Sequence, residues 1–328
     1  MSFCCLFCFF LLFIRIGFPQ KTIFEMMEDG GLTWASYFHE APTPLAFKGT
    51  RTQGARDRFF HFSKFAEHLA EGRLATLTHI DPLYYGVPAF PPNDDHPDHD
   101  VSLGQALFKE VYDMLRATPM WENTLLIITY DEHGGFYDHF PTPIDVPNPD
   151  GQESAEPACD FTRLGPRVPT ILVSPWIERG TVEHGASGPQ PSSQYDHASL
   201  AATLREMFDL PGPLNERDAW AGTFHHLWAN RTTPRTDTPL TMPDPRPLPA
   251  LKKVNGREPA SGLQQELVYM LAGLSADYDV KPEEMNVIQA AMYVQKQVNE
   301  YFGRQMYPEH LLWERHCAGK SLVDDCTY

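Results

Sequence analysis

Residues 124–139, TLLIITYDEHGGFYDH, constrain the fold more than any other stretch of this sequence. The segment opens with an apolar run at residues 125–128, which lies between Asn123 and the Gly134-Gly135 pair. A short apolar run bounded by turn residues is typical of a strand in the interior of a sheet. The sequence therefore predicts a strand buried on both faces at the centre of an α/β fold.

Acidic and imidazole side chains follow this strand directly. Asp131 and Glu132 come first, then His133, and a second acid–imidazole pair, Asp138 and His139, closes the segment. In open α/β sheets, ligands bind just outside the carboxyl ends of the strands. Carboxylates and imidazoles there suit a divalent metal ion or acid–base chemistry. The alternative is a strand followed by an ordinary polar turn.

The elements around this strand predict a mostly parallel sheet. Residues 102–115 carry apolar side chains every four positions and predict a helix that leads into the strand. A second buried strand is predicted at residues 168–174, and alternating helices and strands favour parallel pairing. A helix with a polar start is predicted at residues 192–210.

Weaker patterns complete the outline of the chain. Residues 21–29 predict a short helix, and a strand follows through Trp34 and Tyr37. Residues 58–72 carry a core-facing stripe at helical spacing, in which His61 reads as packed rather than catalytic. Two further helices are predicted at residues 264–273 and 282–303, with Pro282 in the first turn of the second. The predicted domains are a hydrophobic segment (1–20), a catalytic domain (21–245) and a helical appendage (246–328).

Composition excludes some partners. The formal net charge of -17 argues against nucleic acid, because lysine and arginine carry backbone binding. It also argues against docking on an anionic membrane by bulk charge, so any lipid contact would be local and apolar. The sequence gives no indication of the oligomeric state.

The N-terminal segment and the cysteines leave the compartment open. Residues 3–14 are apolar but fewer than the roughly 20 that span a bilayer. The segment is a signal or anchor, which would favour a secretory or membrane-associated protein, or a product of a wrong gene start, which would favour the cytosol. Cys317 and Cys326 could form a terminal disulfide in an oxidising compartment, and no zinc-binding cysteine pattern occurs.

Three more places carry candidate site residues. The loop at residues 81–100 contains NDDHPDHD, which has the residue types of a metal or phosphate site: Asp94, Asp95, His96, Asp98 and His99. Arg167 could hold a phosphate through its fork of donors, or order a loop by bonding a carboxylate. His197 lies where a predicted helix begins, a place that favours anions. Solvated acidic loops and helix caps are the plain alternatives.

Several of these stretches together resemble one family. Residues 131–139 are similar to the D-E-x-x-G-x-x-D-H pattern of the phosphoesterase family that contains plant-type non-specific phospholipases C, bacterial phospholipases C and acid phosphatases. The resemblance extends to the N-D-D-H-P-x-H-D run at 93–100, to the R-V-P and S-P-W elements around Arg167, to the D-H-x-S element at His197 and to RDAWAGTF at 217–224. It covers residues 22–245 closely and the C-terminal helices more loosely.

The resemblance implies a fold and an activity. It implies an alkaline-phosphatase-like α/β/α sandwich that cleaves phospholipids such as phosphatidylcholine at a membrane surface, releasing diacylglycerol and a phosphorylated head group. It implies catalytic roles for His96, His139, His197 and Asp138, with one divalent metal ion on Asp131 and Glu132. Asp95 and Arg167 are the implied substrate-binding residues. An acid phosphatase-like monoesterase is an alternative.

The sequence departs from the family pattern in one respect. The family's E-N-R-S-F-D and T-x-P-N-R motifs, of which the second supplies the nucleophile, do not occur here. No serine or threonine of this sequence can therefore be assigned as nucleophile. The expectation is either a piece of a full enzyme or an inactive relative that binds lipid or phosphate.

Overall fold

The computed structural model of the chain describes residues 14–86, 91–97, 99–151, 153, 160–246 and 256–311. The chain divides into two compact units. Unit 1 comprises Met1–Gln20, Thr33–Glu110 and Pro243–Tyr328, and unit 2 comprises Lys21–Leu32 and Val111–Met242. Most of the predicted hydrophobic segment and all six cysteines, including the predicted terminal pair, lie outside the described residues.

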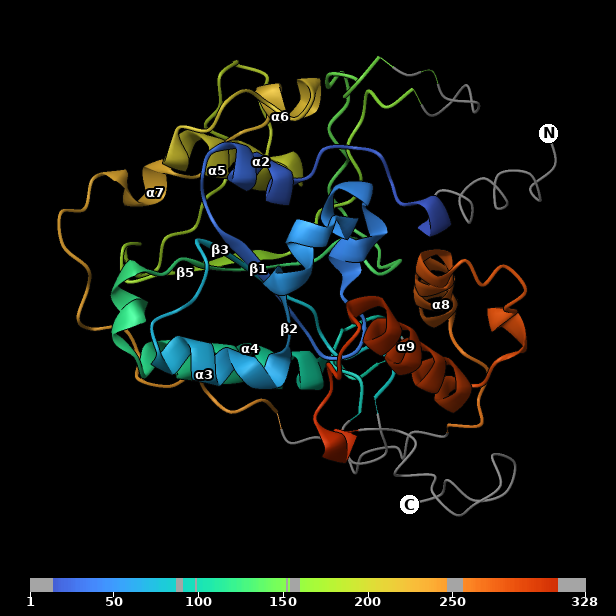
Figure 1. Ribbon diagram of the computed structural model, residues 1–328. Helices are drawn as coiled ribbons and strands as arrows, with labels where there is room; N and C mark the ends of the chain where they lie inside the picture. Colours follow the sequence, from blue (N-terminus) through green and yellow to red (C-terminus); the bar gives the residue numbers. More distant parts are fainter. Residues whose placement is uncertain are drawn as a thin grey trace. The chain divides into compact units, whose positions relative to one another are not determined.

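Figure 1 shows the helices and strands in sequence order. The helices are α2 (Ile23–Asp29), α3 (Phe65–Ala70), α4 (Val101–Arg116), α5 (Ala198–Phe208), α6 (Glu216–Trp220), α7 (His226–Ala229), α8 (Gly262–Ser275) and α9 (Val287–Phe302). The strands are β1 (Trp34–Phe38), β2 (Phe59–His61), β3 (Leu77–Ile80), β4 (Leu126–Thr129) and β5 (Thr170–Val173). The chain is therefore a mixed α/β protein, as the sequence predicts.

Unit 1 contains a three-stranded parallel sheet in the order β2-β1-β3. The predicted strand through Trp34 and Tyr37 is confirmed as the central strand β1, and every one of its residues is buried. The ring of Tyr37 packs edge-on against Phe65 at a centroid distance of 5.2 Å. Aromatic packing of this kind forms the core of unit 1.

The stripe at residues 58–72 is confirmed as core-facing, but it is not one helix. Phe59 lies in β2, where it pairs with Ser36 of β1, and the α-helical part is confined to α3. Pairing with a strand distant in sequence overrides the helical spacing here. His61 is buried and its Nδ1 lies 2.9 Å from the Ser63 hydroxyl, so it is a packed residue as predicted.

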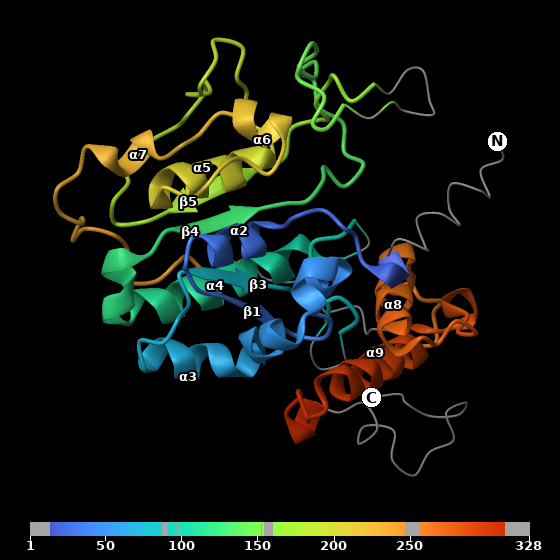
Figure 2. The ribbon, with the colours of Figure 1, turned by 45° about the horizontal axis from the view of Figure 1, so that its top comes forward.

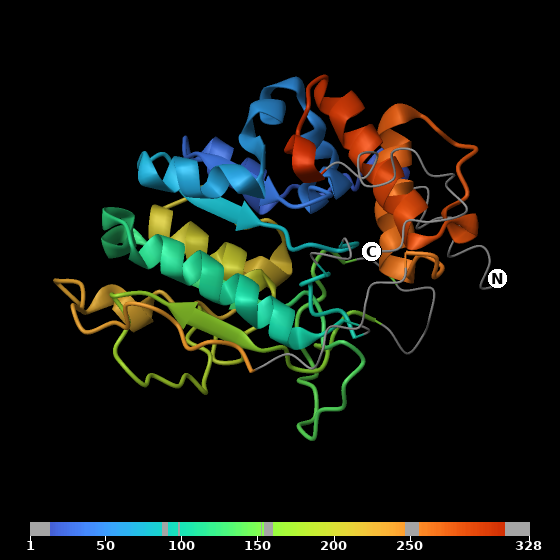
Figure 3. The same ribbon diagram turned by 90° about the horizontal axis from the view of Figure 1, so that it is seen from below.

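The two predicted C-terminal helices are confirmed as α8 and α9, which pack against each other (Figure 3). The ring of Phe302 in α9 lies 5.5 Å from that of Phe59 in β2, and the Tyr85 hydroxyl donates to the Gln264 carbonyl of α8 at 2.6 Å. These helices therefore share the core of unit 1. Pro282 is not in the first turn of α9: it lies in a separate 3-10 helix, because α9 begins only at Val287, after its N-cap Asn286.

Unit 2 contains an antiparallel pair of strands, β4 and β5 (Figure 2). The sequence predicted both strands, but their predicted burial on both faces is wrong. Ile128 is buried, whereas Thr129 and the first two residues of β5 are exposed. Within the described residues, β4 and β5 form a two-stranded sheet of their own, and no residue of β5 is buried, so this strand is not covered on both faces.

The helices of unit 2 begin close to where the sequence places them. The predicted helix at residues 192–210 forms from Ala198 onward as α5, and the predicted helix at residues 21–29 forms as α2. Gly30, which ends α2, is packed so closely that a Cβ atom there would lie 2.2 Å from Leu210 Cδ2. A larger residue at this position would require the Leu210 side chain to move.

Candidate active site

The two adjacent acids of the 131–139 segment lie just beyond the end of β4. Asp131 and Glu132 are both exposed, and the turn that follows them uses Gly134 and Gly135 at φ +66° and +71°. These left-handed conformations favour glycine and reverse the chain immediately after the acids. Both carboxylates are consequently open to a ligand from solvent.

Asp138 is engaged by Arg167. The Arg167 Nε and Nη2 atoms donate to the two Asp138 carboxylate oxygens, each at 2.8 Å. These hydrogen bonds hold the pKa of Asp138 well below its usual range. The Arg167 guanidinium also lies over the Phe140 ring, 4.8 Å from its centroid. The pair ties the segment after β4 to the segment before β5, which is the loop-ordering role that the sequence left open for Arg167.

Two candidate imidazoles lie near this segment. His139 has an 83% exposed side chain, and its Nδ1 lies 3.6 Å from Asp138 Oδ1. His197, immediately before α5, has its Nε2 3.0 Å from the Tyr130 carbonyl. Because Tyr130 directly precedes Asp131, this contact brings His197 to the same strand end as the two acids.

Asp95 and His96 lie in unit 1. Asp95 has a positive φ of 64°, and its carboxylate packs on Gly104 of α4, where a Cβ would lie 2.2 Å from Asp95 Oδ1. The His96 amide donates to Asp94 Oδ1 at 3.2 Å, and the same oxygen is bonded by His99 Nδ1. The loop is thus folded around Asp94.

Two buried acids at the carboxyl ends of the parallel strands escape the sequence patterns. Glu40 follows β1 and accepts from the Tyr84 and Tyr85 amides at 3.1 and 2.7 Å; burial raises its pKa to about 8. Asp81 follows β3 and accepts from the Thr43 amide at 3.2 Å; burial raises its pKa as well. Glu40 follows the predicted strand through Trp34 and Tyr37, and this position is the signal that could have revealed it. The strand before Asp81 was not predicted, so the sequence offered no such signal there.

No cluster of three or more His, Cys, Asp or Glu side chains able to hold a metal ion occurs in the part of the chain that the structure describes. The donor chemistry of Asp131 and Glu132 nevertheless suits a hard cation such as Mg²⁺, which binds one or two carboxylates and takes phosphate oxygens and waters as its other ligands. These two residues therefore fit an open divalent site.

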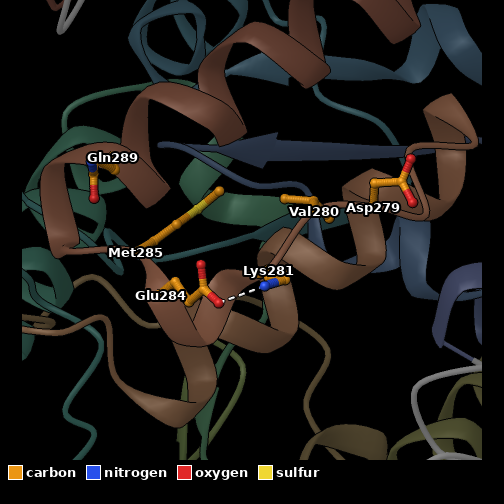
Figure 4. A pocket seen from close by; sticks show the side chains of 6 residues that line it. All are labelled: Asp279, Val280, Lys281, Glu284, Met285 and Gln289. Carbon is orange, nitrogen blue, oxygen red and sulfur yellow. Dashed lines mark hydrogen bonds and ion pairs between the residues drawn. The ribbon is translucent and has the colours of Figure 1, made fainter.

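A pocket of about 450 Å³ lies in unit 1 between the C-terminal elements (Figure 4). Its lining includes an ion pair between Lys281 Nζ and Glu284 Oε1 at 2.7 Å, and none of the sequence-predicted site residues.

Among the described helices, none combines the length and apolarity needed to cross a bilayer.

Comparison with known proteins identifies the family. Residues 13–211 match the phosphoesterase family. The chain belongs to this family. It is 43% identical to non-specific phospholipase C3 of Arabidopsis thaliana over 88% of this chain and 57% of that relative. It is 46% identical to non-specific phospholipase C6 of the same plant, over 85% of this chain and 55% of that relative.

Bacterial members of the family are more distant. Phospholipase C A of Mycobacterium tuberculosis is 26% identical over 68% of this chain and 46% of that relative. These matches confirm the resemblance that the sequence motifs indicate. The chain spans about half the length of the curated relatives it matches.

Proposed function

We propose that this chain is all or part of a phospholipase C-type phosphodiester hydrolase. The substrate would be a phospholipid such as phosphatidylcholine, and the products diacylglycerol and a phosphorylated head group. The observation that carries the proposal is the 43–47% identity to five plant non-specific phospholipases C over at least 80% of this chain. The proposed architecture is an alkaline-phosphatase-like α/β/α sandwich, with residues 21–245 as the catalytic domain and 246–328 as its helical appendage.

The proposed site lies at the end of β4. Asp131 and Glu132 would hold one divalent cation, which when bound would neutralise charge on the phosphate ester. His197 is a proposed proton carrier because its ring reaches the backbone next to these acids. In the same unit, His139 is proposed for the same class of role, and Asp138 supports Arg167 through the paired hydrogen bonds. Within unit 1, described by itself, His96 is also proposed as a proton carrier. Arg167 and Asp95 remain proposed substrate-binding residues.

A membrane surface is the proposed place of action. Phe136, Tyr137 and Phe140, here called the aromatic loop, lie in the segment that follows the two acids, and their side chains are exposed. Aromatic side chains favour the boundary between lipid and water. With a net charge of -17, bulk attraction to anionic lipid is not available. Local apolar contact by the aromatic loop is therefore the proposed mode of docking.

The test measures diacylglycerol release from phosphatidylcholine vesicles by the purified chain and by Asp131→Ala. We expect release by the unmodified chain and a loss of at least about a hundredfold in the variant, since a cation ligand or phosphate contact is removed. Asp150→Ala, which alters an exposed acid of the same unit, should leave the rate unchanged.

Background release by both the unmodified chain and Asp131→Ala would exclude the enzyme for this chain and favour a lipid- or phosphate-binding relative. Activity on soluble phosphate monoesters without activity on vesicles would favour a phosphatase instead. Calorimetric titration with Mg²⁺ tests cation binding independently of catalysis, because Asp131→Asn should weaken Mg²⁺ binding whether or not turnover occurs.

A further inference from the structure

We propose that Arg217 is a positioning residue that sets His197 and the hairpin after the acidic segment in place at the end of β4. Its relevance to catalysis rests on the proposed function, but its structural effect does not. Arg217 lies on the short helix α6, and no sequence pattern assigned it a role.

Arg217 bonds three separate parts of unit 2. Its Nε donates to the Pro147 carbonyl at 2.8 Å and its Nη2 to the Phe161 carbonyl at 2.6 Å. Its Nη1 lies 3.4 Å from Asp196 Oδ2, and both side chains of this ion pair are largely buried. The planar guanidinium can serve three acceptors in fixed directions, which a lysine ammonium cannot.

The two carbonyls belong to the arms of one hairpin, residues 143–148 and 160–164. The arms are joined by hydrogen bonds from the Val146 amide to the Thr162 carbonyl and from the Leu164 amide to the Pro143 carbonyl, both 2.9 Å. Phe161 has a φ of +61°, a conformation that is costly for a bulky residue. The bond from Arg217 to its carbonyl offsets part of this cost and fixes the second arm, which continues toward Arg167.

The third partner leads to His197. The Asp196 carboxylate accepts the Ala198 amide at 2.9 Å, and the Asp196 amide donates to the Ser199 hydroxyl at 3.1 Å. Asp196 thus fixes the first turn of α5 while Arg217 holds its other carboxylate oxygen. The neighbouring His197 ring then reaches the Tyr130 carbonyl. One cation therefore orients both the imidazole and the hairpin that flank the acids.

The test compares Arg217→Met with Arg205→Met in histidine-labelled protein by NMR, without substrate. Arg205 is a suitable control because it is a largely buried arginine of the same unit that pairs with a buried acid, Asp218. The variant His197→Gln identifies the His197 ring resonances. We expect Arg217→Met to displace these resonances and to speed amide exchange at Val146 and Leu164 by at least about tenfold, because charge-assisted hydrogen bonds are lost. Arg205→Met should leave the resonances and both amides unchanged.

Unchanged His197 resonances in folded Arg217→Met would overturn the proposal, as would equal displacement in Arg205→Met, which would indicate general loosening. Should Arg217→Met not fold, Arg217→Lys retains the charge near Asp196 but loses the forked bonds. It is expected to show fast hairpin exchange, and wild-type exchange in it would also overturn the proposal. The two proposals can fail independently. If the chain releases no diacylglycerol, the proposed function fails, but the NMR results still test the positioning role of Arg217.

Discussion

Burying a carboxyl group away from water costs less free energy when the group stays protonated, and Glu40 is such a buried group. Its folded pKa of about 8 lies above the ordinary 4.5, so the folded state retains a proton that the unfolded state releases between these pH values. Stability therefore falls as pH rises through this window. His39 acts oppositely: burial lowers its pKa from 6.5 to about 4, so stability falls as pH drops through that range.

The two effects cancel between about pH 4.5 and 6.5, where their windows overlap. From pH 6.5 to 8 only the Glu40 effect remains, and it is expected to cost about 2 kcal/mol. Burial also raises the pKa of Asp81, so its titration lowers stability with rising pH over its own range. Urea unfolding at pH 5.5, 6.5 and 8 should show a decline above pH 6.5 that is flatter in Glu40→Gln. The control Glu71→Gln changes an exposed acid of the same unit, and an equally flattened profile in it would contradict the assignment.

At the scale of single elements, the strand pair β4–β5 gives a sharper test of packing. Ile128 and Ile171 are direct partners in its register, but Ile128 is 7% exposed and Ile171 is 53% exposed. Truncating a buried isoleucine removes contacts and leaves a cavity, whereas truncating a half-exposed one does neither in full. Denaturant unfolding should show a loss of about 2–4 kcal/mol for Ile128→Ala and less than about 1 kcal/mol for Ile171→Ala. Equal losses would mean that the one face shared by these two directly opposed residues is covered equally over both strands.

The same elements show how much of the fold could be predicted from the sequence. Helix α4 was predictable because its apolar side chains recur at helical spacing, and β4 because its apolar run ends at turn residues. Strand β5 was predicted as a strand, but the parallel pairing that the sequence favoured is wrong for it, since β4 and β5 pair antiparallel and such pairing depends on tertiary contacts. For the proposed site, residue types singled out Asp131, Glu132 and His197 as candidates. The contact of His197 with Tyr130 and the burial of Glu40 required coordinates, because an acid after a strand reads equally as a solvated turn.

At the scale of the whole molecule, charge and apolar exposure predict different kinds of membrane binding. The net charge of -17 opposes attraction to anionic lipid, so binding that depends on the aromatic loop should occur on neutral phosphatidylcholine vesicles and change little with salt. Phe136 and Tyr137 are 68% and 91% exposed, and burying such side chains in the lipid boundary is favourable.

Vesicle sedimentation should therefore show at least about tenfold weaker partitioning for the double variant Phe136→Ser with Tyr137→Ser, since each buried aromatic side chain contributes 1.5 kcal/mol or more by rough transfer estimates. The matched control, Val182→Ser with Leu240→Ser, removes two side chains of the same unit that are 70% and 76% exposed but lie far along the chain from the acidic segment. We measure binding rather than turnover because the aromatic loop adjoins Asp131 and Glu132, where substitutions can also disturb chemistry. If both double variants lose binding equally, apolar exposure in general drives it. If neither does, the aromatic loop is not the membrane contact.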